Sequence, residues 1–176
     1  MTMWSRKAFA CLLALAVTVG AGCTSSESPT EPQVSAPDPL LSSLATTLKN
    51  IKLLSCSAQP YATKSQTVGP QGGTITIGTH RLTIPSGALK RPVTIKAEQV
   101  PGRVNSVRFS PEGLRFERPV SLTLSYANCS PLLLLKRVVY VDEGLRILEL
   151  LPSLDDLRTK TVTGSIRHFS RYAVAW

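Results

Sequence analysis

A cysteine near the start of the chain, Cys23, stands where its thiol could be chemically modified. Arg6 and Lys7 precede a mostly apolar stretch, residues 8–19, and small residues then lead into Cys23. A basic start, an apolar segment and small residues before a cleavage point are the parts of an export signal. This order predicts export, removal of residues 1–22 as a signal peptide, and attachment of lipid to the cysteine sulfur.

Two alternatives to lipid attachment concern the same segment. A membrane-spanning helix needs roughly 18 or more apolar residues, and this stretch is shorter and ends in Gly-Ala-Gly-Cys. An ordinary secretory signal would make Cys23 a coincidence, although Gly20 stands where lipoprotein signals more often carry leucine. We therefore expect a bacterial lipoprotein, held to a membrane of the cell envelope by its lipid. Thr24, rather than Asp, follows the cysteine, which by resemblance to enterobacterial sorting favours the outer membrane, facing the periplasm or the surface, over the inner one.

Two cysteines remain for other chemistry, because Cys11 leaves with the signal and Cys23 would carry lipid. Cys56 and Cys129 would meet an oxidising compartment, where two remaining cysteines most simply form a disulfide. The two cysteines are 73 positions apart, and in the chain-entropy model a disulfide that closes so long a loop stabilises the folded state by about 4 kcal/mol. The alternative is a pair of free thiols.

Charge limits the classes of partner. Removing the signal takes away two of the 20 basic residues and none of the 11 acidic ones, which leaves a net charge of +7. The basic residues are spread along the chain, and aromatic residues do not alternate with them as in single-strand nucleic-acid binders. We therefore expect no nucleic-acid partner. An ordinary solvated surface stays open, as does an anionic glycan or lipid of the envelope as the ligand.

The remaining polar residues do not predict a cofactor or a metal. His80 and His168 are too distant in sequence from the two cysteines to complete a zinc site. The Asp-Glu-Gly of residues 142–144 predicts a hairpin turn rather than a calcium loop, since no further oxygen ligands follow. Asp155 and Asp156 are expected to cap a helical turn over residues 151–157 rather than to act as paired catalytic carboxylates.

The elements that position these residues follow from composition and periodicity. Residues 23–39 combine the lipid-bearing cysteine with Ser, Thr, Pro and acids, and predict a disordered linker. Residues 40–55 carry apolar side chains at three- and four-residue spacing, which predicts a short amphipathic helix. Residues 56–176 then form the folded domain.

Within that domain the pattern changes to short segments of period two, separated by Gly and Pro. Many short strands at this spacing predict an all-β protein with an antiparallel β-sandwich. The candidate strands are residues 74–77, 82–84, 93–95, 107–109, 120–124, 138–141, 145–150, 162–166 and 172–176.

Several blocks of this domain resemble the ZU-five domain, named for a zonula occludens protein and the uncoordinated-five netrin receptor and also found in ankyrins. The family's Gly-Gly start corresponds to residues 72–73, and its Ile-Pro-x-Gly-Ala-Leu corner to residues 84–89. Its Pro-x-Gly-Leu-x-Phe-x-x-Pro-Val segment corresponds to residues 111–120, and the closing block is residues 168–176. The resemblance covers residues 67–176. It implies a β-sandwich that serves protein interaction or structure, without enzyme activity and without a shared small-molecule or cofactor site.

The resemblance also implies one chemical alternative, at His168, Phe169 and Ser170. This His-Phe-Ser is similar to the motif of ZU-five modules that cut themselves and of self-cleaving nucleoporins. In that mechanism the Ser170 hydroxyl would attack the Phe169 carbonyl, and water would hydrolyse the resulting ester. His168 would act as a base or orient a strained peptide. The other interpretation is three consecutive strand residues, with Phe169 buried and its neighbours pointing outward.

Overall fold

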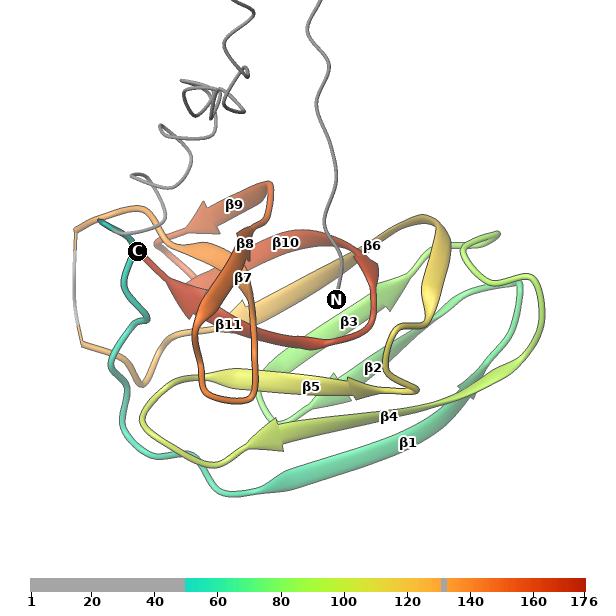
Figure 1. The fold of residues 1–176 in the computed structure, drawn as a ribbon, viewed down its shortest axis with the longest axis horizontal. Coiled ribbons are helices and arrows are strands. Elements are labelled where there is room, and N and C mark those ends of the chain that lie inside the picture. The colour runs from blue at the N-terminus through green and yellow to red at the C-terminus, as the bar shows by residue number, and fades with distance from the viewer. Residues whose placement is uncertain (1–49, 131–132) are drawn as a thin grey trace, which may run out of the picture. The chain divides into compact units, whose positions relative to one another are not determined.

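The computed structural model describes residues 50–130 and 133–176, and these form two antiparallel β-sheets packed face to face (Figure 1). The predicted all-β sandwich is therefore confirmed. The predicted signal peptide, Cys23, the linker and residues 40–49 of the predicted helix lie outside the described residues.

One sheet has six strands and the other has five. In spatial order, the six-stranded sheet contains β1 (Ala62–Val68), β4 (Val93–Val100), β5 (Ser106–Ser110), β11 (Arg171–Ala175), β7 (Arg137–Val141) and β8 (Ile147–Leu150). The five-stranded sheet contains β2 (Gly73–Ile77), β3 (His80–Ile84), β6 (Arg115–Ser125), β10 (Thr161–His168) and β9 (Ser153–Asp156). Each strand predicted from alternation corresponds to one of these, because alternation places one face of the strand in the core.

Two strands were not predicted. β1 is an edge strand of polar residues, in which only Val68 is buried. β9 replaces the helical turn that was predicted over residues 151–157, and that prediction is wrong. Ser153 does not cap a helix: its hydroxyl accepts a hydrogen bond from the Val138 amide. Residues 153–156 instead pair with β10, and this pairing holds them in an extended conformation.

The predicted helix is also wrong at its C-terminal end, since residues 51–55 are extended. The Lys52 amide and carbonyl both bond to Trp176, and the Leu54 amide donates to the Val174 carbonyl. Ile51 and Leu53 pack against the outer face of the six-stranded sheet. Covering the apolar outer faces of β7 and β11 thus prevails over the helical period of these side chains.

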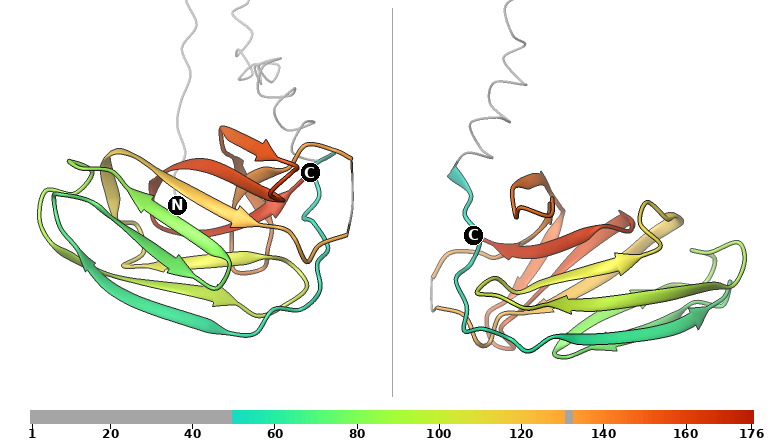
Figure 2. Two further views of the ribbon diagram at one scale, coloured as in Figure 1. Left: turned by 180° about the vertical axis from the view of Figure 1, so that it is seen from behind. Right: turned by 60° about the horizontal axis from the view of Figure 1, so that its bottom comes forward.

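The main hydrophobic core lies between the two sheets, whose strands can be followed from two further sides in Figure 2. The two sheets are in close contact where Gly164 of β10 faces Val138 of β7. A Cβ atom built on Gly164 would lie 2.6 Å from Cβ of Val138, so a larger side chain at this position in β10 would push the sheets apart.

Candidate functional site

The disulfide predicted from the sequence is present. Cys56 and Cys129 are joined with an S–S distance of 2.05 Å. The two residues also form an isolated antiparallel bridge, and next to it the Ser130 amide donates to the Ser55 carbonyl. The disulfide therefore fastens the segment by which the chain enters the sandwich to the loop that follows β6.

The predicted reactive residues His168, Phe169 and Ser170 meet at the corner between β10 and β11. The Phe169 amide donates to the Leu114 carbonyl at 2.8 Å. The Phe169 carbonyl oxygen accepts a hydrogen bond from the Gly113 amide at 3.0 Å. Gly113 has φ +74°, a conformation that favours glycine. The carbonyl that Ser170 would attack is thus held by one backbone donor.

The Phe169 side chain is a core residue. Its ring is fully buried and stacks on Phe109 with ring centroids 5.1 Å apart. It also forms a T-shaped pair with Phe116, with ring centroids 4.9 Å apart. Such aromatic pairs add to the stability gained by burial alone. Burial of Phe169 is confirmed. The rest of that interpretation is wrong, because Phe169 and Ser170 lie between strands β10 and β11, and Ser170 is buried rather than pointing outward.

The imidazole of His168 faces other groups. It lies edge to face with Tyr140 at 5.3 Å, and 6.2 Å from the Tyr172 ring. The Tyr172 hydroxyl donates to the His168 carbonyl at 2.6 Å, and burial raises the pKa of that hydroxyl above its usual value. Among the hydrogen bonds of the described residues, none joins the His168 ring to the Ser170 hydroxyl. His168 and Ser170 are therefore close in sequence, but the His168 ring is not placed to act as a base toward the Ser170 hydroxyl.

The corner at residues 168–170 also lacks the strained backbone conformation that self-cleavage would use. Within residues 50–130 and 133–176, the non-glycine residues with positive φ are Leu145 and Lys160. The corner at residues 168–170 does not include either, so it lacks this form of strain.

His80, the other histidine, is a structural residue. It is fully buried, its Nδ1 accepts a hydrogen bond from the Ser125 amide at 3.1 Å, and its Nε2 lies 3.2 Å from Oε1 of Gln59. Accepting at Nδ1 leaves Nε2 to donate, which fixes one neutral tautomer. Burial lowers the pKa of His80 to about 4. The ring therefore stays neutral at pH 7 and joins β3 to the end of β6.

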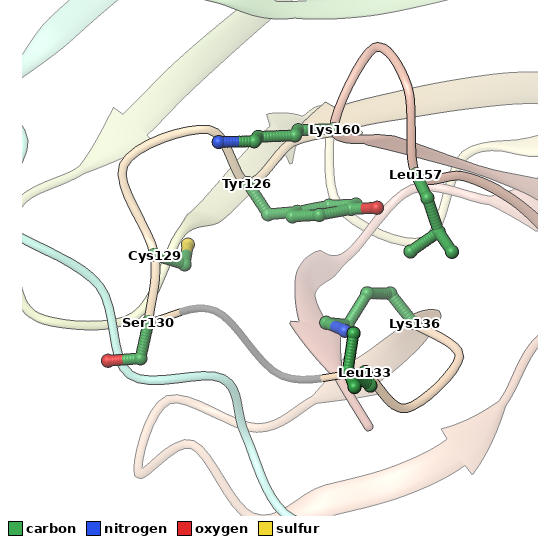
Figure 3. Close-up of a pocket in the computed structure, with 7 residues that line it drawn as sticks. All are labelled: Tyr126, Cys129, Ser130, Leu133, Lys136, Leu157 and Lys160. Atoms are coloured by element: carbon green, nitrogen blue, oxygen red, sulfur yellow. The ribbon is translucent and has the colours of Figure 1, made fainter.

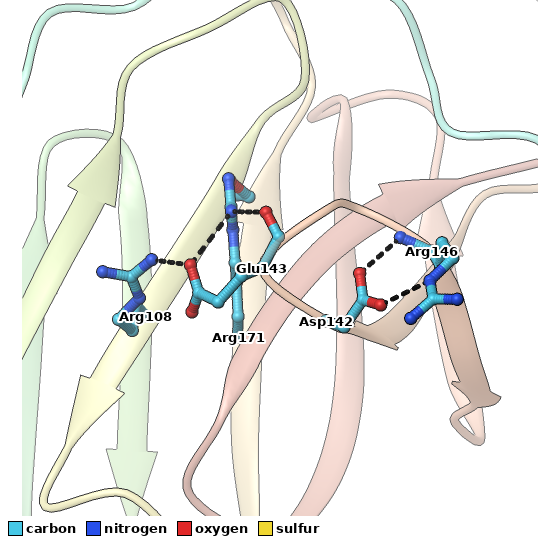
Figure 4. A network of polar contacts seen from close by, with 6 residues as sticks. Arg108, Asp142, Glu143, Arg146 and Arg171 are labelled. Atoms are coloured by element: carbon cyan, nitrogen blue, oxygen red, sulfur yellow. Dashed lines mark hydrogen bonds and ion pairs between the residues drawn. The ribbon is translucent and has the colours of Figure 1, made fainter.

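The predicted hairpin turn at residues 142–144 is confirmed, and its acidic residues have structural partners (Figure 4). Glu143 forms an ion pair with Arg108 on β5, and its carboxylate lies 3.6 Å from the guanidinium of Arg171 on β11. Arg171, largely buried, also donates to the Glu143 carbonyl and to the Ser106 hydroxyl. Asp142 pairs with Arg146 within the turn. These contacts hold the turn against the six-stranded sheet and leave the carboxylates paired.

A surface that the sequence analysis missed lies at the end of the sandwich that carries the disulfide. A pocket of about 250 Å³ opens there, lined by Tyr126, Cys129, Leu133, Leu157, Lys136 and Lys160 (Figure 3). A second pocket, of about 270 Å³, shares Lys136 with the first and adds Leu135 and Leu154. We call Leu133, Leu135, Leu154 and Leu157 the leucine rim. Their exposed fractions are 99%, 66%, 80% and 54%.

Polar groups beneath the leucine rim bond to one another. The Tyr126 hydroxyl donates to Asp155 at 2.6 Å, and the other carboxylate oxygen of Asp155 accepts from the Lys136 amide at 2.8 Å. Burial, followed by the hydrogen bond to Asp155, raises the pKa of Tyr126 above its usual value. The Lys136 ammonium donates to the Leu134 carbonyl and lies 5.4 Å from the centre of the Tyr126 ring. What this surface offers to a ligand is therefore mainly apolar.

The sequence contained one signal for this surface, the run of leucines between Pro131 and Lys136. The run has no alternation and no turn residue, so periodicity assigns it no face. The opposite side of the rim, residues 154–157, belongs to the segment that was predicted as a helical turn. Their proximity depends on the pairing of β9 with β10 and of β10 with β6.

Comparison of the sequence with family models and with curated proteins finds no significant match. In the part of the chain that the structure describes, no group of three or more His, Cys, Asp and Glu residues is placed to hold a metal ion. No helix in that part is long and apolar enough to cross a membrane.

Proposed function

We propose that this chain is a lipid-anchored protein of the bacterial cell envelope, and that its β-sandwich is a non-catalytic interaction or structural module of the ZU-five type. The anchor is acylated Cys23, and residues 24–39 form the linker. The observation that carries the interaction role is the leucine rim. Clustered, exposed apolar side chains on a folded domain are typical of sites that meet a partner.

The disulfide supports an exported location. Disulfides persist in secreted and envelope proteins and are rare in reducing compartments. Cys56 and Cys129 are bonded in the structure, as export would require of two remaining cysteines. The lipid on Cys23 and the disulfide thus follow from the same compartment.

Contacts between the blocks of the family resemblance support the ZU-five assignment. The Gly87 amide donates to the Pro70 carbonyl at 2.7 Å. A Cβ atom on Gly72 would lie 2.3 Å from the Ile84 carbonyl oxygen. Gly113 in the third block bonds to Phe169 in the fourth. Gly72, Gly87 and Gly113 also have positive φ (79°, 75° and 74°), which favours glycine at these three positions.

Removing the cysteine tests the anchor. We expect Cys23→Ser to move the protein from the membrane pellet to the soluble fraction, because the acyl chains contribute about 0.8 kcal/mol of membrane affinity for each buried CH₂ group. Immunoblots of fractionated cells would measure the shift. Ser25→Ala is the control, since it changes a nearby linker residue without touching the anchor or the disulfide. A Cys23→Ser protein that stays in the pellet under high salt would contradict the proposal.

Self-processing at Phe169–Ser170 is the second candidate function, and one contact favours it. The Gly113 amide, 3.0 Å from the Phe169 carbonyl oxygen, would stabilise the oxyanion formed when the Ser170 hydroxyl attacks. The peptide C–N bond between Phe169 and Ser170 would then break, the Ser170 nitrogen would take a proton, and an ester between the Phe169 carbonyl and the Ser170 oxygen would remain. Water would hydrolyse this ester and release the Phe169 carboxylate.

Intact-mass spectrometry decides between the two candidates. The non-catalytic module predicts a single species that retains residues 170–176, with the same pattern for wild type and Ser170→Ala. The position of the His168 ring against Tyr140 is the physical reason. A wild-type body ending at Phe169, absent from the Ser170→Ala variant, would instead establish self-processing.

A further inference from the structure

The leucine rim lies beside the point where the chain enters the sandwich. The Ser130 amide donates to the Ser55 carbonyl, and Cys129, which lines the first rim pocket, is bonded to Cys56. Residues 24–49 connect Cys23 to this same end of the domain. A lipid anchor on Cys23 would therefore tether the domain through the entry segment, at the end of the sandwich that also carries the rim.

Basic side chains flank the rim. Lys160 lines the first pocket and Arg137 the second, and both are exposed. Exposed Arg158 lies in the same turn as Lys160. Two acids lie nearby: Asp155 accepts from the Tyr126 hydroxyl and the Lys136 amide, and Asp156, which is exposed, accepts from the amides of residues 158 and 159. The three exposed basic residues outnumber these two acids. The charge that this end presents outward is positive, which is complementary to anionic headgroups.

We propose that the leucine rim docks directly on the anionic surface of a lipid bilayer. The four leucines would enter the boundary between headgroups and acyl chains, and Arg137, Arg158 and Lys160 would lie among the headgroups. Apolar area and basic charge act together at such interfaces. The choice of a bilayer as the occupant rests on the proposed lipid anchor. Docking would orient the domain with the rim facing the bilayer. Strand β1, at the edge of its sheet opposite β7 and β8, would then face away from the bilayer.

Depth measurements on the purified full-length mature protein test this proposal. A fluorophore is attached to a cysteine introduced by Leu133→Cys or Leu157→Cys, and the protein is added to vesicles containing phosphatidylglycerol. Leu148→Cys is the matched control, because Leu148 is an exposed leucine on β8 that lines neither rim pocket. We expect lipids brominated in their acyl chains to quench the two rim labels at least about threefold more than the control.

The lipid dependence identifies the chemistry of the occupant. With vesicles of phosphatidylcholine alone, or with Lys160→Gln and Arg158→Gln together, the quenching at residue 133 should fall, because the electrostatic attraction is lost. Rim labels that stay as solvent-exposed as residue 148 in vesicle-bound protein would overturn the proposal and leave the rim to a protein partner. A rim label shielded only by a soluble anionic glycan would overturn it too.

Failure of the anchor would look different from failure of docking. The mass of the N-terminal peptide from the same sample reports acylation directly. Acylated protein with water-exposed rim labels would retain the proposed function and reject docking. Protein without acylation whose rim labels enter the bilayer would reject the anchor and retain docking. Protein that neither carries lipid nor associates with vesicles would reject both.

Discussion

The buried ring of His80 couples folding to pH. In the folded protein Nδ1 accepts the Ser125 amide and burial lowers the pKa to about 4, whereas the unfolded chain has an ordinary histidine pKa near 6.5. The unfolded state therefore binds the proton more readily, and the free energy of unfolding decreases as pH falls through this interval. The full loss, reached near pH 4, is roughly 3 kcal/mol.

Urea unfolding at pH 7 and pH 5 tests this coupling. Between these values, wild type should lose roughly 2 kcal/mol more than His80→Gln, which has no proton to gain. The other titrating groups are common to both proteins and cancel in the comparison. Thr83→Ala, an exposed position on the same strand without a titrating side chain, is the control and should keep the wild-type dependence. Parallel pH profiles for wild type and His80→Gln would show that His80 does not carry the effect.

Among the elements, β10 and β7 form a close contact between the two sheets. Gly164 faces Val138 with no room for a methyl group. Gly164→Ala should therefore lower the free energy of unfolding by roughly 1–3 kcal/mol through overpacking. Gly144→Ala is the matched control, because the nearest atom to its new Cβ would be 3.4 Å away, and its change should stay within about 0.5 kcal/mol. Equal denaturant midpoints for the two variants would contradict this description of the interface.

Most strands could be predicted because their alternation is decided locally. β3 alternates buried and exposed residues along its length, and β2 does so from residue 74 on. Residues 51–55 and 153–156 could not be assigned in this way. Their conformation depends on partners distant in sequence, namely Trp176 for the first and β10 for the second. Tertiary pairing here overrides a local helical pattern.

The same distinction applies to the candidate sites. The pair Cys56 and Cys129 followed from counting cysteines, and the corner at residues 168–170 followed from a short motif. The hydrogen bond from Gly113 to Phe169 and the position of the His168 ring required the fold. The leucine rim could be found only from the fold. Its two sides, residues 133–135 and residues 154–157, are neighbours because β6, β10 and β9 lie side by side in the sheet.

At the scale of the whole molecule, the disulfide and the leucine rim lie at the same end of the sandwich. The disulfide links the entry segment to the loop after β6, and that loop borders the leucine rim. If Cys23 carries the proposed lipid and the rim docks as proposed, the domain would be held at a membrane in a preferred orientation. The opposite edge, formed by polar β1, would face solution.

Mass spectrometry of the N-terminal peptide, from protein purified out of the native envelope, tests the central claim most directly. The lipid-anchored module predicts a peptide that begins at Cys23 and carries acyl chains on that residue. A peptide that begins elsewhere, or one with an unmodified Cys23, would contradict it.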